Sequence, residues 1–264
     1  MTEQILRAQD GHVLTLMLNR PEKKNAITDA LGWQLVQMIR DAARDDSVWV
    51  LAITGAGDAF CSGLDLSGTE INKVLTAQEQ ALDDLAWVSA FFLSIRKECD
   101  KPVVAGINGA AVGGGLALAM ACDMRIVSKS AKLMAGHTRI GGSPDGGLSY
   151  TLSQAIGYEQ AMRFMLENKT VQGEEAVRLG MAGECVDDDK MQSRLAEYCA
   201  SLAQWSPLTL RAIKRVMSRA VEHRDMEGHL RYEYATILRT FASEDGQEAR
   251  KAFLEKRKPE FKGR

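Results

Sequence analysis

The 264-residue sequence predicts an α/β protein of stacked β–β–α units, followed by a region that is almost entirely helical. Short apolar runs typical of strands alternate with helical patterns at intervals of roughly fifty residues, which disfavours an antiparallel sandwich. From Gly157 onward helical periodicity dominates, with one brief strand pattern at residues 184–186. No linker rich in proline or serine divides the two parts, so we expect one domain with a helical extension that docks on a neighbouring subunit.

The first predicted elements are a hairpin, a helix and a buried strand. Residues 3–18 alternate around Asp10-Gly11, which predicts a β-hairpin. Thr28 can cap a helix whose apolar residues recur at helical spacing, at Leu31, Leu35, Met38 and Ile39. The apolar run 48–54 then predicts a strand that ends at the glycines of 55–57.

The later elements follow the same alternation. A polar stretch at 68–78 leads into an amphipathic helix that continues to about residue 99, and 103–107 reads as a strand. A short helix at 116–121, a strand at 124–127 and a helix at 148–156 come next. Residues 188–256 are nearly all helical in pattern, with breaks at Ser206-Pro207 and near residues 244–246.

Composition excludes several classes of protein. Charged residues make up 26% of the chain with a formal net charge of −2 and no basic domain, so we expect no nucleic-acid partner. The longest apolar stretch is too short to cross a bilayer and the start lacks a secretory pattern, so we expect a cytoplasmic protein with no membrane partner. The five cysteines are scattered without a Cys-x-x-Cys spacing, so no metal or redox site is predicted.

Two glycine-marked segments, 60–66 and 108–115, carry the strongest chemical signal. Each follows an apolar run that reads as a strand, and the second opens a helix. Backbone without bulky side chains can turn its N–H groups toward a ligand oxygen. Two such donors can form an oxyanion hole, which stabilises charge on an acyl oxygen. The pair therefore indicates acyl chemistry.

The second glycine segment allows other interpretations: nucleotide binding is excluded by its motifs, whereas a purely structural role stays open. The dinucleotide fingerprint Gly-x-Gly-x-x-Gly is absent there, and the phosphate-loop motif is absent from the chain. Three glycines at 113–115 could instead serve only the close packing of a helix on a strand. Taken alone, the segment does not separate packing from oxygen binding.

Asp145 and His137 are candidates for proton transfer. Asp145 stands among four glycines at 141–147, where an aspartate in a turn or at a helix N-cap is the commoner role. The alternative is a carboxylate that acts as a base or nucleophile in a cleft. His137 is either a solvent-facing loop residue or a proton-transfer partner. Trp87, Phe91 and Phe92 fit an acyl pocket or the core equally well.

The chain resembles the crotonase superfamily, the enoyl-CoA hydratase/isomerase family. The matching landmarks are residues 18–26, 60–66, 102–115, 122–126 and 252–257, which together span nearly the whole chain in the usual order. The resemblance implies a spiral core of β–β–α units over residues 1–200 and a helical oligomerisation region over 201–264. It also implies a homotrimer or a dimer of trimers.

The resemblance further implies an acyl-CoA thioester substrate, with no other cofactor and no metal. The oxyanion-hole donors would be the backbone N–H groups of Leu64 and Gly114. Residues that would meet the adenine and phosphates of CoA are Arg20, Lys24, Ser62, Asp65 and Leu66. Phe253 and Lys256 would contribute from a neighbouring subunit, with the lysine as a point charge for a phosphate.

The departures from the family pattern narrow the set of reactions that we expect this chain to catalyse. Hydratases of the family carry two glutamates, and the corresponding positions here hold Ala117 and His137. The Asp145 loop resembles that of dienoyl-CoA and epoxyphenylacetyl-CoA isomerases, so the resemblance favours a catalytic Asp145. We expect an unsaturated acyl-CoA isomerase with an aspartate base. The alternatives are hydrolysis or dehalogenation by an Asp145 nucleophile, hydration without two glutamates, and non-catalytic acyl-CoA binding.

Overall fold

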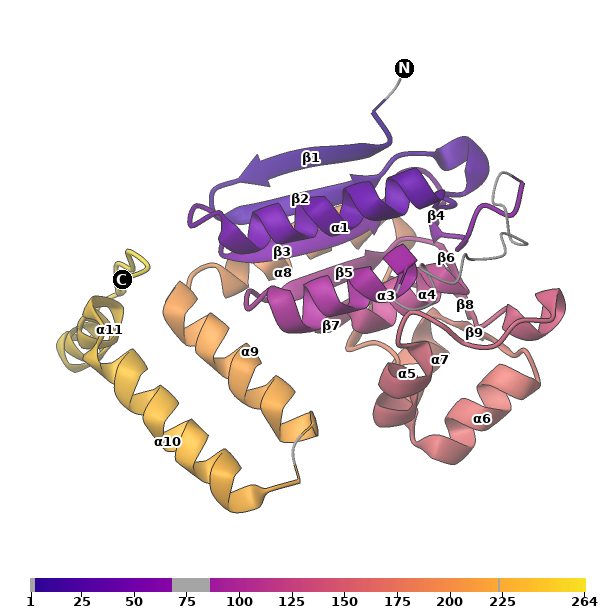
Figure 1. Cartoon of the computed structure of the whole chain (residues 1–264). Helices are drawn as coiled ribbons and strands as arrows, with labels where there is room; N and C mark the ends of the chain where they lie inside the picture. Colours follow the sequence, from indigo (N-terminus) through magenta and orange to yellow (C-terminus); the bar gives the residue numbers. More distant parts are fainter. Residues whose placement is uncertain (1–2, 68–85, 223) are drawn as a thin grey trace, which may run out of the picture.

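The main sheet of the protein has six strands in the order β1-β2-β3-β5-β7-β10 (Figure 1). The computed structural model describes residues 3–67, 86–222 and 224–264. The strands are β1 (Ile5–Asp10), β2 (Val13–Leu18), β3 (Val50–Gly55), β5 (Val103–Ile107), β7 (Met124–Ser128) and β10 (Glu184–Val186). The β1–β2 pair is antiparallel and all the other pairs are parallel, which confirms the predicted hairpin and the alternating units.

A second sheet of four short strands lies beside the first. It consists of β4 (Ala59–Cys61), β6 (Ala110–Val112), β8 (Lys132–Met134) and β9 (Thr170–Gln172), in that order. The strands β4, β6 and β8 run parallel, and β9 pairs antiparallel to β8. The successive pairs β3–β4, β5–β6 and β7–β8 therefore each send one strand to the main sheet and the next strand to the second sheet. The sequence did not predict these four strands, since three residues are too few to show alternation.

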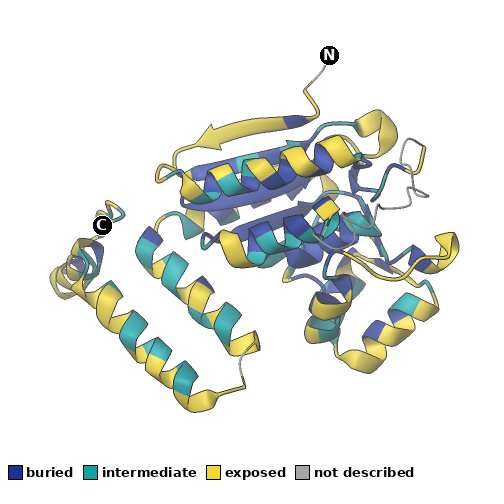
Figure 2. Ribbon diagram, in the orientation of Figure 1, coloured by how far each residue is buried: buried dark blue, intermediate teal, exposed yellow. Residues whose placement is uncertain are grey.

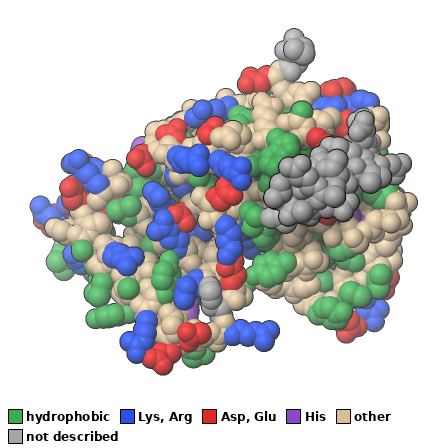
Figure 3. Space-filling model, viewed as in Figure 1, with side chains coloured by type: hydrophobic (Ala, Val, Ile, Leu, Met, Phe, Trp, Pro, Cys, Tyr) green, Lys and Arg blue, Asp and Glu red, His purple; other side chains and the backbone are tan. Residues whose placement is uncertain are grey.

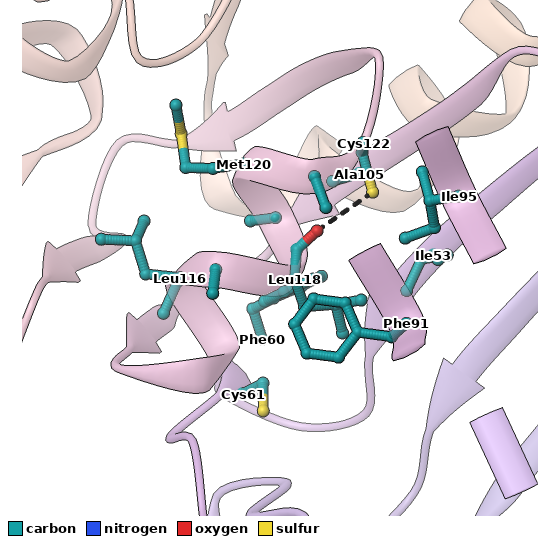
Figure 4. Close-up of a cluster of buried hydrophobic side chains, with 14 of the residues drawn as sticks. Ile53, Phe60, Cys61, Phe91, Ile95, Ala105, Leu116, Leu118, Met120 and Cys122 are labelled. Atoms are coloured by element: carbon teal, nitrogen blue, oxygen red, sulfur yellow. Dashed lines mark hydrogen bonds between the residues drawn. The ribbon is translucent and has the colours of Figure 1, made fainter. Parts of the chain in front are cut away.

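Helices cover both faces of the main sheet (Figures 1 and 2). The helices α1 (Asp29–Arg44), α3 (Ala86–Leu93, continued by the π-helix η2, Ser94–Glu98) and α4 (Gly114–Ala121) enclose the larger core. Thr28 caps α1 as predicted, by accepting the N–H of Leu31 at 3.3 Å. In this core Phe91 of α3 packs with Phe60 and with Leu118 of α4 (Figure 4). The helix α8 (Met191–Leu202) packs on the opposite face, against β3, β5 and β7.

The remaining helices of the first part of the chain lie near the second sheet. They are α5 (Leu148–Ile156), α6 (Tyr158–Leu166) and α7 (Gly173–Leu179), with single 3₁₀ turns at η1 (Pro21–Lys23), η3 (His137–Ile140) and η4 (Asp188–Lys190). The polar stretch predicted at 68–78 lies outside the described residues. The helix expected to continue from it is described from Ala86 onward.

Three helices extend from this body: α9 (Pro207–Glu222), α10 (Met226–Ala242) and α11 (Glu244–Glu255) (Figure 1). The break at Ser206-Pro207 occurs as predicted. The second break falls at Ser243, which caps α11, so residues 244–246 form its first turn. The sequence did not predict the end of α9 at Glu222, because no glycine or proline stands between it and the start of α10 at Met226.

Candidate active site

The fold brings the two glycine segments into contact. Cys61 of β4 pairs with Ala111 of β6, and each of the two segments then turns at a glycine. Gly63 has φ +92°, and a Cβ there would lie 2.7 Å from the Val112 carbonyl oxygen and 3.3 Å from the Gly114 nitrogen. A Cβ at Gly115 would lie 2.1 Å from the Cys61 carbonyl oxygen. Close packing therefore does require these glycines, and it also places residues 63 and 114 side by side.

Two backbone donors remain available at this junction. The groups on either side of Leu64 are used, because Ile27 N–H bonds the Gly63 oxygen at 2.8 Å and Asp65 N–H bonds the Ile27 oxygen at 2.9 Å. Gly114 is the first residue of α4, where backbone N–H groups have no partner within the helix. Within the described residues no carbonyl accepts the N–H of Leu64 or Gly114, and both residues are half-buried. Two neighbouring donors, one of them at a helix N-terminus, can bind an acyl oxygen.

The next unit delivers His137 to the same junction. Pairing of β8 with β6 sets Met134 opposite Val112, and Gly113 N–H bonds the Met134 oxygen at 3.1 Å. A Cβ at Gly136 would lie 3.0 Å from the Val112 side chain, so the chain before His137 lies against the second glycine segment. His137 begins η3, and only 9% of its side chain is exposed. It is therefore not a solvent-facing loop residue.

Asp145 faces His137. Its Oδ1 lies 3.3 Å from His137 Nε2, and 54% of its side chain is exposed. The backbone of Asp145 does form a turn, because its carbonyl accepts the N–H of Leu148 at 3.0 Å. Its carboxylate does not cap α5, whose N-cap is Gly147 with no side-chain bond. The carboxylate is thus free of the commoner structural role and is aimed at a buried imidazole.

The loop that carries Asp145 covers Ala117. Gly146 has φ +58°, and a Cβ there would lie 3.0 Å from both Ala117 Cβ and Phe91 Cζ. At Gly147, with φ +75°, it would lie 2.5 Å from the Phe92 ring. Ala117 is completely buried, so a glutamate there would displace this loop. Phe91 and Phe92 therefore support the Asp145 loop, and Trp87 is buried in the core.

The residues expected to meet CoA gather at the rim of the first glycine segment, but they are largely bonded to protein groups. The Arg20 guanidinium donates to Asp65 Oδ2 at 3.0 Å and to the Ala26 oxygen at 2.6 Å. Hydrogen bonds from Ser67 and then from Arg20 lower the pKa of Asp65 to about 2. Ser62 N–H donates to the Lys24 oxygen at 3.0 Å, and Leu66 is 47% exposed. These bonds fix the segment that carries Leu64.

Asp58 and Asn25 also lie at this rim, and neither was predicted as a site residue. Lys24 Nζ pairs with Asp58 at 2.6 Å, and this contact lowers the pKa of the Asp58 carboxyl. The buried Asn25 accepts Arg20 N–H and donates to the oxygens of Ala56 and Ala59. It therefore joins the loop after β2 to β4. Its only signal in the sequence is its place within the 18–26 landmark.

Phe253 lies on α11 and Lys256 directly follows this helix, which is on the opposite side of the molecule from α4 and α5 (Figure 1). Phe253 is 82% exposed, and Lys256 caps α11 with φ 55°. The chain does not bring them to its own site, and their contribution from a neighbouring subunit stays a prediction.

Other reactive groups are scarce in the part of the chain that is described. Burial raises the pKa of the Cys61 thiol beneath the site to about 12, and all five cysteines are free. Within residues 3–67, 86–222 and 224–264, no three His, Cys, Asp or Glu side chains are grouped to hold a metal ion. Over the same residues no helix is long and apolar enough to span a membrane.

Known proteins are similar to this chain in sequence and in fold. The family model for enoyl-CoA hydratase/isomerase matches residues 8–264. The chain is 31% identical to the 1,2-epoxyphenylacetyl-CoA isomerase and 31% identical to the 2,3-dehydroadipyl-CoA hydratase of Escherichia coli K12, over all of each protein. The crystal structure of enoyl-CoA hydratase from Bacillus anthracis superposes with a TM-score of 0.89 at 28% identity, covering 99% of this chain and 100% of that one. The chain therefore belongs to the enoyl-CoA hydratase/isomerase family and has the crotonase fold.

Proposed function

We propose that this protein is an unsaturated acyl-CoA isomerase in which Asp145 transfers the proton. The observation that carries the proposal is the placement of the Asp145 carboxylate: it faces His137 at 3.3 Å, caps no helix, and stands on a loop packed over Ala117. The site thus offers one carboxylate where the two-glutamate hydratase arrangement would need positions 117 and 137.

The backbone donors and the carboxylate have complementary tasks. The N–H groups of Leu64 and Gly114 bind the thioester oxygen, and removal of one such donor typically costs about 3–4 kcal/mol of transition-state stabilisation. Asp145 removes a proton from carbon, the C–H electron pair enters the enolate, and the charge collects on the bound oxygen. The protonated Asp145 then returns its proton to another carbon of the enolate, which moves the double bond.

Exchange with deuterated water tests this role directly. A panel of enoyl-, dienoyl- and aryl-CoA thioesters is incubated with the protein, and mass spectrometry measures deuterium in substrate and product. We expect Asp145→Asn to lower the exchange rate about 100-fold or more. Asp189→Asn, an exposed aspartate outside the site, is the matched control. If Asp145→Asn exchanges within tenfold of the parent protein, Asp145 is not the base.

A nucleophilic Asp145 is the second candidate. It is favoured by the exposure of the carboxylate and by its bonding within the described residues, where His137 contacts Oδ1 and Oδ2 is left able to attack carbon. Such attack would lead to dehalogenation or hydrolysis through a covalent ester. A single turnover in ¹⁸O-labelled water separates the two: a nucleophilic carboxylate delivers its own ¹⁶O to the product. Binding of acyl-CoA without exchange or turnover would indicate a binding protein.

We also propose that the protein assembles as a homotrimer or a dimer of trimers through α9–α11. The helices line a groove of about 1050 Å³ with the side chains of Ile213, Met217, Leu230, Tyr234, Ile237 and Phe241. Each of these six side chains is roughly half or more exposed in the single chain. A helical face of this kind is expected to be covered by another subunit.

A further inference from the structure

We infer that His137 is a positioning residue, which donates Nε2–H to Asp145 Oδ1 and leaves Oδ2 as the atom that carries the substrate proton. The inference rests on the proposed function, in which Asp145 is the base. It assigns separate tasks to the two oxygens of one carboxylate. It also assigns one tautomer to the imidazole.

The two ring nitrogens of His137 have opposite surroundings. Nε2 lies 3.3 Å from Asp145 Oδ1. Nδ1 is buried and has no hydrogen-bond partner in the residues that the structure describes. The chain before the ring is held by β8 and by the contact of Gly136 with Val112, so the ring enters the site from a fixed backbone.

This asymmetry selects a tautomer. A proton on Nδ1 would bury a donor without an acceptor and would turn the Nε2 lone pair toward a carboxylate oxygen. Of the two neutral tautomers, only the one with its proton on Nε2 both satisfies Asp145 and avoids an orphan donor. In that form, the Nε2 proton is engaged with Oδ1.

The consequence for the reaction is that the histidine keeps its proton throughout. Oδ1 continues to accept Nε2–H while Oδ2 forms its O–H bond with the proton taken from carbon. The same O–H bond breaks when the proton returns to another carbon. Neither transfer needs a change at His137, so the imidazole orients the base and does not relay protons.

The Asp145 loop makes such an orienting bond necessary. The loop is flanked by glycines in the left-handed region at 141, 146 and 147, and a Cβ at Gly141 would meet nothing within 4 Å. The aspartate side chain is 54% exposed, so packing alone does not select its rotamer. A fixed donor on the enclosed side of the site does select it.

Three substitutions of His137 separate positioning from proton transfer. Gln carries an amide N–H close to the position of Nε2, Asn carries one only near Nδ1, and Leu carries none. We expect His137→Gln to exchange substrate protons within about tenfold of the parent protein, and His137→Asn and His137→Leu to lose about 100-fold through misplacement of Asp145. Equal losses in all three variants, or full activity in His137→Leu, would overturn the inference.

A spectroscopic readout needs no active variant. In ¹⁵N-histidine-labelled protein, the His137 signals are assigned by their loss in His137→Gln. We expect a proton on Nε2, and a predominant Nδ1–H tautomer would contradict it. The two proposals fail separately. Unimpaired exchange in Asp145→Asn rejects the base, whereas equal Gln and Leu variants beside an inactive Asp145→Asn reject only the role of His137.

Discussion

The spiral core and the C-terminal helices bury their apolar residues in different ways. Every residue of β3 and β5 is buried, and so is every residue of α4 after Gly114. No residue of α10 is buried, although the helix is 17 residues long, and Phe253 and Leu254 of α11 are about 80% exposed. Hydrophobic side chains reach the surface over α10 and α11 (Figure 3). The apolar residues of the core are covered within one chain, whereas those of the helical region are left exposed, as the proposed assembly requires.

The two regions are joined at a buried lysine. Lys214 of α9 donates to the backbone oxygens of Ile95 and Lys101, each at 2.8 Å, and pairs with Asp123 at 2.8 Å. These bonds satisfy all three donors of the ammonium group, which is how a charge can be accommodated in the interior. The base of the helical region is therefore fixed to the core while the rest of it extends outward.

The largest expected effect lies in the core, at the contact between the glycine segments. In Gly115→Val the new Cβ would lie 2.1 Å from the Cys61 oxygen, which is backbone and cannot rotate away. We expect a loss of more than about 4 kcal/mol in the free energy of unfolding and little folded protein. Urea unfolding followed by circular dichroism measures it.

The matched control for that variant is Gly183→Val. Gly183 is exposed, and a Cβ there would have an ordinary contact of 3.7 Å with the Arg125 oxygen. It tests whether glycine loss in itself harms the protein. If the free energy of unfolding of Gly115→Val lies within about 1 kcal/mol of the parent value, the inferred close approach of the two glycine segments is wrong.

The second effect lies in the helical region and should leave the core intact. We expect the triple variant Leu230→Ser, Tyr234→Ser and Phe241→Ser to weaken self-association by 100-fold or more, since burial of each such side chain contributes about 1.5–3 kcal/mol. Sedimentation equilibrium measures the association, and circular dichroism checks that the core remains folded.

The control for the helical variant exchanges the ion pair of Glu227 and Arg231 for serines. These side chains are about three-quarters exposed and lie outside the groove. The two serine substitutions should leave the assembly unchanged. A parent protein that sediments as a monomer at every concentration would break the comparison between the two regions.

The smallest effect is a pH dependence within the core. Hydrogen bonds from Ser67 and Arg20 lower the pKa of Asp65 from 3.8 to about 2 in the folded protein. A carboxyl with a lowered folded pKa stabilises the protein above its unfolded pKa, and this contribution is lost as the pH falls through the folded value. Asp65→Asn should thus be less stable than the parent at pH 7, with a difference that shrinks between pH 4 and about 2.

Urea unfolding at a series of pH values measures this difference. The control is Asp189→Asn, which removes an exposed carboxylate that belongs to neither glycine segment. A difference between Asp65→Asn and the parent that stays constant down to pH 2 would show that the bonds to Asp65 do not hold the segment.

The elements predicted from the sequence were those whose signal is local. The alternation around Asp10-Gly11 and the cap at Thr28 are readable because neighbouring residues form those structures. The strands β4, β6, β8 and β9 escaped prediction because their pairing depends on segments far apart in the chain. The end of α9 at Glu222 escaped because no glycine or proline stands between it and the start of α10.

The features of the candidate site likewise divide into those that the sequence predicts and those that it does not. The glycine segments could be recognised because a backbone that approaches closely demands glycine itself. The pairing of His137 with Asp145 and the packing of Gly146 on Ala117 could not, because each depends on how one loop lies over α4. The roles of the CoA-binding residues, of Phe253 and of Lys256 stay predictions.

The complete burial of α4 beyond Gly114 has a consequence for how reactions diversify on this scaffold. The end of the helix that is proposed to bind the thioester cannot be altered without repacking the interior, whereas the Asp145 loop rests on the helix through glycines and an alanine methyl group. Substitutions in the loop can therefore exchange one acid–base arrangement for another while substrate activation is inherited unchanged. Engineering of a new reaction would begin at residues 137–147 and leave 113–121 as they are.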